Sequence, residues 1–171
     1  MRKIFALLLA LVMLPCSSLA EMETIPEKPD YSAMPIEEAA MAIGQNTLEA
    51  YWQFLSCEVY PDVIYVDVKQ EGLFFDTQSL LIASIRFAIE YMQEAFLLDQ
   101  VPQLYFRFHE NGRDQYGQQV DMITITMRIT REKAAELNLE YFHEYAVTKQ
   151  LAFLQAINGY SLFRDYKAIA Q

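Results

Sequence analysis

Two runs of alternating apolar and polar residues constrain the fold more than any other feature of this chain. The first run, residues 104–109, places Leu104, Phe106 and Phe108 on one face. The second run, residues 121–130, places four apolar residues on the same face: Ile123, Ile125, Met127 and Ile129. Because successive side chains of a strand point to opposite faces, each run predicts a strand with one buried and one solvated side. The polar linker "ENGRDQYGQQ" between them predicts an antiparallel hairpin with a long tip.

The remaining periodic segments predict helices and one more strand. Apolar residues recur at spacings of three and four over residues 35–56, which predicts an amphipathic helix. Residues 64–68 alternate, with Tyr65 and Asp67 on the solvated side. Asp76 or Thr77 is expected to cap a long apolar helix that runs to about residue 98. Thr130 is expected to cap a helix over residues 131–137, and a further helical segment covers residues 141–157.

The order of these elements, α-β-α-β-β-α-α, predicts a single α+β domain over residues 35–171. The strand, helix, strand succession favours a crossover between parallel strands. With the hairpin this gives a small mixed three-stranded sheet that helices cover on one face. The tail after Gly159 is expected to add a last turn over the core.

The N-terminal twenty residues have the order of a secretory signal peptide. Arg2 and Lys3 precede a short apolar run, and Ser18-Leu19-Ala20 ends the segment with small residues where a signal peptidase cuts. We therefore expect a signal peptide over residues 1–20, a flexible leader over residues 21–34, and export to the periplasm or the medium. A permanent anchor would need about 20 apolar residues. A lipoprotein would need a small residue before Cys16, where the chain has Pro15.

The composition of the mature chain limits the classes of molecule that it is expected to bind. Removal of Arg2 and Lys3 leaves 11 basic residues against 23 acidic ones, a formal charge of −12. Such a surface repels phosphate backbones, so we expect no nucleic acid, and membrane contact only through the signal peptide. Cleavage also removes Cys16, so Cys57 has no partner for an internal disulfide and is expected to be buried at the end of the first helix.

Motifs of catalysis and metal binding are incomplete or missing in the sequence. His143-Glu144 begins a His-Glu-x-x-His pattern, but Val147 stands where the second histidine would be. The chain has neither a G-x-S-x-G motif nor a glycine-rich phosphate loop, and Cys57 has no basic neighbour in the sequence. No cofactor, metal site or catalytic set is therefore predicted.

The solvated face of the predicted sheet is the best candidate for function. Basic residues gather about the predicted hairpin, between residues 107 and 133, although the protein is acidic: Arg107, Arg113, Arg128, Arg131 and Lys133. Tyrosine together with arginine is the composition favoured at binding surfaces. The expected binding set is Tyr65, Tyr105, Arg107, His109, Thr124, Thr126 and Arg128. An ordinary solvated face, with no ligand at all, would have the same alternation.

Three functional hypotheses follow from this face and from the apolar helices. The first is an exported, non-catalytic domain that binds a protein or a small anionic ligand through the solvated face. The second is a small extracytoplasmic enzyme, hydrolase-like, that uses His109 with Arg107 and Asp121. Glu110 is adjacent in the strand and should point to the opposite face from His109. The third is a subunit of a larger envelope assembly, held by the apolar C-terminal helices.

Overall fold

The computed structural model describes residues 29–48, 52–71, 76–113 and 115–163. Within them, five strands form one mixed sheet in the order β1-β2-β3-β4-β5. Strand β2 pairs with β3 in parallel, and the other three neighbouring pairs are antiparallel. The bounds are β1 Trp52–Val59, β2 Ile64–Gln70, β3 Gln103–Arg113, β4 Gln119–Thr130 and β5 Gly159–Leu162. The α+β class and the parallel crossover are confirmed, and the sheet has five strands where three were predicted.

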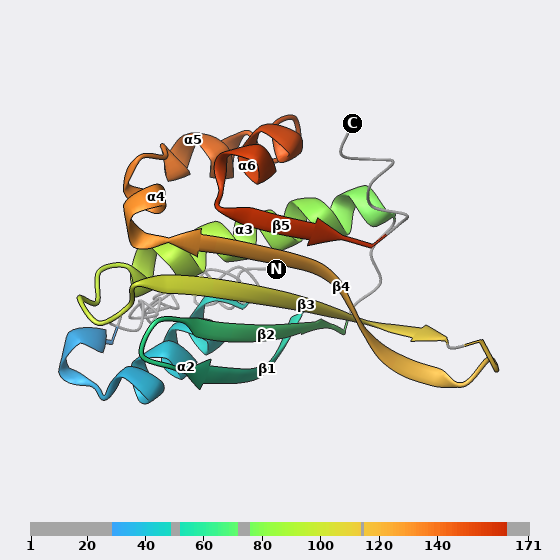
Figure 1. Cartoon of the computed structure of the whole chain (residues 1–171), viewed down its shortest axis with the longest axis horizontal. Coiled ribbons are helices and arrows are strands. Elements are labelled where there is room, and N and C mark those ends of the chain that lie inside the picture. Colours follow the sequence, from blue (N-terminus) through green and yellow to red (C-terminus); the bar gives the residue numbers. More distant parts are fainter. Residues whose placement is uncertain (1–28, 49–51, 72–75, 114, 164–171) are drawn as a thin grey trace, which may run out of the picture.

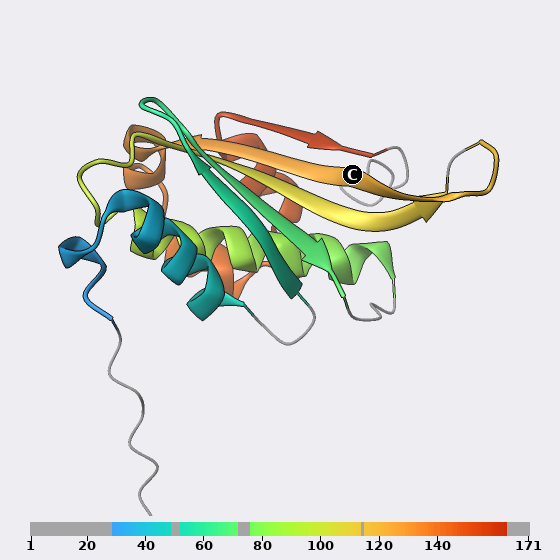
Figure 2. The same ribbon diagram turned by 90° about the horizontal axis from the view of Figure 1, so that it is seen from below.

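Helices cover one face of the sheet and leave the other open, as Figure 2 shows in a view along the layers. The bounds are η1 Tyr31–Ala33, α2 Ile36–Thr47, α3 Thr77–Ala95, α4 Arg131–Ala135, α5 Leu139–Glu144 and α6 Gln150–Ala156. The N-cap predictions hold, since Asp76 accepts from the backbone N–H of Ser79 and Thr130 from that of Lys133. Within the described ranges, no helix is long and apolar enough to cross a membrane.

The core lies between the long helix α3 and the central strands (Figure 1). Phe87 and Tyr91 of α3 meet Phe106 edge-on, with ring centroids 6.3 and 5.6 Å away. Phe106 also stacks on Phe108 at 6.2 Å. These rings are buried, so aromatic contacts on the inward side of β3 fix the helix layer to the sheet.

The first predicted helix was too long, because its last five residues, 52–56, lie in strand β1. Helix α2 ends at Thr47, and the chain then returns antiparallel to β2. A β-bulge lies between Phe54 and Ser56, so the inward residues Phe54 and Cys57 are three apart instead of two. A spacing of three residues between inward side chains is also typical of one face of an α-helix. The helix and strand pack closely, since a Cβ on Gly44 would lie 2.0 Å from the ring of Phe54.

A second bulge changes the face of one predicted binding residue. The pairing of β3 with β4 shifts between Phe108 and His109, so His109 pairs with Ile123 and Phe108 with Ile125. Thr124 between them turns to the helix side, where it is 5% exposed, whereas Ile123 is 46% exposed. The predictions that Thr124 faces solvent and that Ile123 faces the core were therefore wrong. Alternation holds on both sides of a bulge but fails across it.

The C-terminal part also departs from the prediction. The helical segment over residues 141–157 is two helices, α5 and α6, joined by a turn. The stop at Asn158-Gly159 leads into β5, which extends the sheet along β4. Strand β5 has only four residues, too few for alternation to distinguish it from a loop.

Cys57 lies in β1 rather than at a helix end, and it is half-buried. Its Sγ is 3.9 Å from the hydroxyl of Tyr91, and burial raises the pKa of the thiol to about 11. The reactive thiolate is therefore scarce at pH 8. We expect native Cys57 to react with a maleimide on the order of a hundredfold more slowly than in the urea-unfolded chain. Equal rates in the two states would contradict this packing.

Candidate functional site

The open face of the sheet gathers charged and aromatic side chains from four strands. The parallel register places Tyr65 opposite Tyr105, Asp67 opposite Arg107, and Lys69 opposite His109. All six residues alternate with the buried residues of β2 and β3, so they share the face that none of the described helices covers. We call the connected set the outer-face network: Ser56, Glu58, Asp67, Lys69, Arg107, His109 and Asp121.

Asp67 is the centre of this network. Its side chain is 7% exposed, and its two oxygens accept three hydrogen bonds. One comes from Ser56 Oγ at 3.0 Å, one from Arg107 Nη2 at 2.5 Å, and one from His109 Nε2 at 2.9 Å. Burial alone would raise the pKa of Asp67, but these hydrogen bonds outweigh it and hold the pKa below its ordinary value. Asp67 is thus an ionised carboxylate on the sheet surface, with donors on three sides.

His109 bridges Asp67 to the outer end of the network. Its Nε2 faces Asp67, and its Nδ1 lies 2.7 Å from Asp121 Oδ2. A neutral imidazole can donate from only one nitrogen, so the form that donates to both carboxylates is the imidazolium. Lys69 Nζ lies 2.8 Å from the other oxygen of Asp121. The hydrogen bond from Lys69, followed by that from His109, lowers the pKa of Asp121.

Arg107 joins the charges to a row of tyrosines. Its guanidinium carbon lies 4.9 Å from the ring centroid of Tyr65, and its Nη2 lies 3.7 Å from Glu58 Oε2. The Tyr65 ring in turn lies 5.7 Å from Tyr60 and 5.2 Å from Tyr105, measured between centroids. The hydrogen bond to Asp67 raises the pKa of Arg107, so its charge is permanent.

The structure brings together six of the seven predicted binding residues and moves one away. Tyr65, Tyr105, Arg107, His109, Thr126 and Arg128 lie on the open face, whereas Thr124 lies on the helix side. The prediction missed the central role of Asp67 and the contributions of Ser56, Lys69 and Glu58. The alternation of residues 64–68 placed Asp67 on the solvated side, but only the pairing of β2 with β3 places it beside Arg107 and His109.

The gathering of basic residues in the sequence is not a free positive patch. Arg131 donates to the backbone carbonyls of Phe96, Leu98 and Val101, where it closes the C-terminal end of α3. Lys133 pairs with Glu136 at 2.7 Å, and Arg113 donates to the carbonyl of Gly117. Arg128 remains exposed on β4. Most of these basic side chains are therefore held by hydrogen bonds or ion pairs to nearby parts of the same chain.

Comparisons of the chain with protein-family models, curated proteins and solved structures find no match.

The geometry is that of an ordered surface more than of a reaction centre. A catalytic histidine needs one ring nitrogen for the substrate while the other is oriented by a partner. In His109 both nitrogens face carboxylates. Among the described residues, no three histidine, cysteine, aspartate or glutamate side chains are placed to hold a metal ion. His143, the other histidine, pairs with Glu90 of α3 at 2.7 Å.

Proposed function

We propose that this protein is an exported, non-catalytic domain that binds a protein partner through the open face of its sheet. One observation carries the proposal: the central charges of this face are already paired with one another, beside a row of tyrosine rings. Side chains held in place before binding lose little freedom when a partner arrives. Tyrosine and arginine are also the residues that most often supply binding energy in protein interfaces.

A protein partner fits this face better than a small anion. Among the arginines that the structure describes, Arg107 alone lies at the centre of the network, and it is held by Asp67, Glu58 and the ring of Tyr65. An anion would have to displace the Asp67 carboxylate to reach it. A flat protein surface could instead contact the exposed side chains at the edge of the network, such as Arg128 and Ile123, and leave the ion pairs intact.

The enzyme hypothesis receives less support from the same geometry. Its three residues, Arg107, His109 and Asp121, do belong to one network. Nevertheless, a substrate proton would find no ring nitrogen of His109 without breaking a hydrogen bond to a carboxylate. Binding needs no such rearrangement.

A second candidate surface lies on the C-terminal helices, as the assembly hypothesis requires. Tyr141 and Tyr145 are 39% and 43% exposed, and Val147 beyond them is 52% exposed. The two tyrosine rings lie 4.9 Å apart, so they form one aromatic patch on the helix layer. The helices that carry this patch belong to the layer on one face of the sheet, and the outer-face network lies on the other face (Figure 2).

Photo-crosslinking in the native host distinguishes these surfaces. A photoreactive phenylalanine analogue would replace Tyr105 on the sheet, Tyr145 on the C-terminal helices, or Leu97, which is 74% exposed, as the control. We expect one protein to couple at position 105 and not at 97.

With purified components, Tyr105→Ala and Arg128→Glu should each weaken binding at least about tenfold. N-terminal sequencing of the coupled material should begin at Glu21.

Two results would contradict the proposal. Coupling at position 145 with none at position 105 would assign the interface to the helices. Unchanged affinity in both Tyr105→Ala and Arg128→Glu, with folding intact, would remove the sheet face as the binding surface.

A further inference from the structure

A row of residues crosses the strands on the open face of the sheet. The registers of the four strand pairs place one residue of each strand, from β1 to β5, opposite the next: Glu58, Tyr65, Tyr105, Arg128 and Gly159. We call this set the cross-strand row. Residues opposite one another on neighbouring strands share a face, so the row lies on the side that none of the described helices covers. Its middle consists of two tyrosine rings, with centroids 5.2 Å apart.

The acidic end of the row is already paired within the protein. Glu58 Oε2 lies 3.7 Å from Arg107 Nη2. Farther along the strands, Asp67 holds the same guanidinium, and Asp121 binds Lys69 Nζ at 2.8 Å. A partner that used any of these charges would first have to break an ion pair of the protein.

Arg128 stands at the other end of the row and is exposed. Its guanidinium has no ion pair or hydrogen bond with any residue that the structure describes. The side chain lies beside Gly159, since a Cβ built on that glycine would be 3.9 Å from Arg128 Nε. The glycine contributes no side chain that would cover the guanidinium. The row therefore presents two half-buried tyrosine rings followed by one available positive charge.

The spacing of the row matches that of a polyproline II helix. Neighbouring strands lie about 4.8 Å apart, so Tyr65 and Arg128, two strands apart, are separated by about 9.6 Å along the row. A polyproline II helix has three residues per turn and rises about 3.1 Å per residue, so residues i and i+3 lie about 9.3 Å apart on the same side. An extended β-strand returns to the same side every second residue, at about 6.6 Å, and does not match this distance.

We propose that the open face binds a proline-rich segment of the partner that crosses the strands, with prolines on Tyr65 and Tyr105 and a carboxylate three residues away on Arg128. This rests on the proposed function, because it specifies which kind of protein segment the open face takes. Proline-rich segments commonly dock on aromatic side chains, and a carboxylate forms charge-assisted hydrogen bonds with a guanidinium. Such a segment is already extended before it binds, so it loses little freedom.

The attraction for the carboxylate is local. The chain carries a formal net charge of −10 at pH 7, so its overall field repels an acidic segment. Binding must therefore depend on the particular arginine that the segment reaches, and a basic residue elsewhere on the surface should not replace it.

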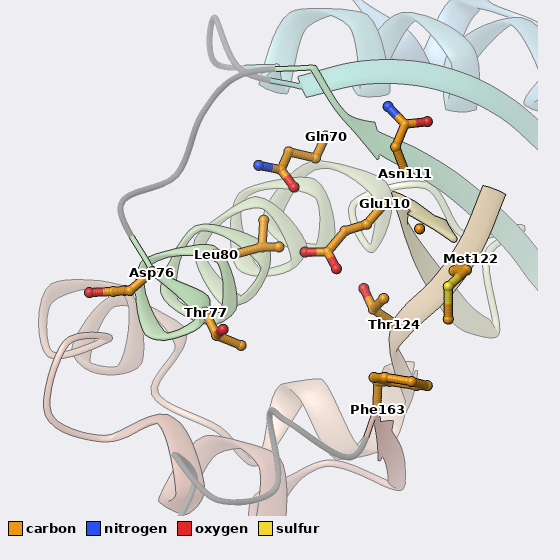
Figure 3. A pocket seen from close by; sticks show the side chains of 10 residues that line it. Gln70, Asp76, Thr77, Leu80, Glu110, Asn111, Met122, Thr124 and Phe163 are labelled. Carbon is orange, nitrogen blue, oxygen red and sulfur yellow. The ribbon is translucent and has the colours of Figure 1, made fainter. Parts of the chain in front are cut away.

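The helix side of the sheet offers no comparable site for an acidic segment. A cavity of about 420 Å³ lies there, with Leu80, Met122 and Thr124 in its wall (Figure 3). Of the described residues that line it, the charged ones are Asp76 and Glu110, both acidic. The amide signals of Leu80 and Thr124 therefore serve as reporters of binding at the wrong side of the sheet.

Three heptapeptides test the ligand class. Each is a capped proline peptide whose central residue is glutamate, glutamine or lysine, so prolines lie three residues away on both sides and either chain direction is covered. Titration followed by heteronuclear NMR should show the glutamate peptide shifting the amide signals of Tyr65, Tyr105 and Arg128. The glutamine peptide should bind at least about threefold more weakly, as expected for the loss of an exposed ion pair, and the lysine peptide more weakly still.

Variants of the row separate its two parts. Arg128→Gln removes the charge and should bind the glutamate and glutamine peptides equally, whereas Arg128→Glu should prefer the lysine peptide. Tyr105→Ala should weaken the glutamate and glutamine peptides by the same factor, because it acts on the prolines. The matched control, Arg113→Glu, reverses the charge of an exposed arginine at the far end of β3 and should leave the order of the three peptides unchanged.

Equal binding of the three peptides would overturn the proposal, as would an unchanged order in the Arg128 variants. Shifts confined to Leu80 and Thr124, or no shift with any peptide, would also overturn it. The proposed function has its own test: if a partner couples at position 105 while the peptides fail, the open face binds protein through a segment of another kind.

Discussion

Replacement of Phe106 by alanine should lower the free energy of unfolding by about 3 to 5 kcal/mol. The ring is fully buried and contacts Phe87, Tyr91 and Phe108 at the junction of the sheet with α3. Truncation removes these contacts and leaves a cavity that the surrounding rings cannot fill without leaving their rotamers. Urea unfolding followed by the fluorescence of Trp52, whose ring lies 5.6 Å from Phe108, measures the loss.

The control for Phe106→Ala is the same substitution at an exposed phenylalanine. Phe163 is 45% exposed at the end of the described chain, and Phe163→Ala should change stability by no more than about 0.5 kcal/mol. If the two variants unfolded at the same urea concentration, the inward face of β3 would have been assigned wrongly.

Replacement of Asp67 by alanine should cost about 3 to 5 kcal/mol, because it removes the 7% exposed carboxylate that Ser56, Arg107 and His109 share and leaves the Arg107 guanidinium without it. Arg107 and His109 would keep their places on the sheet while losing the carboxylate between them. The matched control is Asp121→Ala, at the more exposed end of the network. Its carboxylate is 43% exposed, so the loss there should be about 1 kcal/mol or less. A larger effect at Asp121 than at Asp67 would contradict the assignment of Asp67 as the centre.

The same network predicts how stability depends on pH. The pKa values of Asp67 and Asp121 are lower in the folded protein than their ordinary values. Their contribution is therefore complete above the ordinary carboxyl pKa, near 4, and is lost as the pH falls through the folded values. Urea midpoints of the wild type should fall below about pH 4, and those of Asp67→Asn should fall less steeply.

If Arg107 were an ordinary surface residue, Arg107→Ala would change the free energy of unfolding by no more than about 0.5 kcal/mol. Arg107 does face outward, so its strand register was predicted correctly. It also donates to the Asp67 carboxylate, which is 7% exposed. Loss of a donor to a buried acceptor costs about 1 to 3 kcal/mol, and this larger figure replaces the first.

Elements with an uninterrupted period could be predicted from the sequence. Helix α3, strand β2 and the inward residues of β3 each keep one spacing over several positions, so the apolar residues alone reveal the buried side. Strand β1 and the turn of Thr124 were missed because a bulge adds one residue and changes the spacing there. Strand β5 was missed because it is short and because its position depends on its pairing with β4.

The sequence predicted which face of the sheet carries the candidate site, but not which side chains contact one another there. Alternation assigns Arg107 and His109 to the solvated side of one strand, and Asp67 to the solvated side of another. Whether they meet depends on the register between two parallel strands whose residues are 40 apart in the chain, and local sequence does not encode that register.

The central position of Asp67 also has a consequence for how the strands find their alignment. The inward residues Leu104, Phe106 and Phe108 are all large and apolar, so a slip of two positions between β2 and β3 would still bury apolar side chains. The charged face would not tolerate it. One slip places Arg107 opposite Lys69, and the other places Arg107 opposite Tyr65 while Asp67 lies opposite His109, so in both Arg107 loses the carboxylate opposite it. Misaligned chains would thus hold charges without partners, which selects the native pairing during folding.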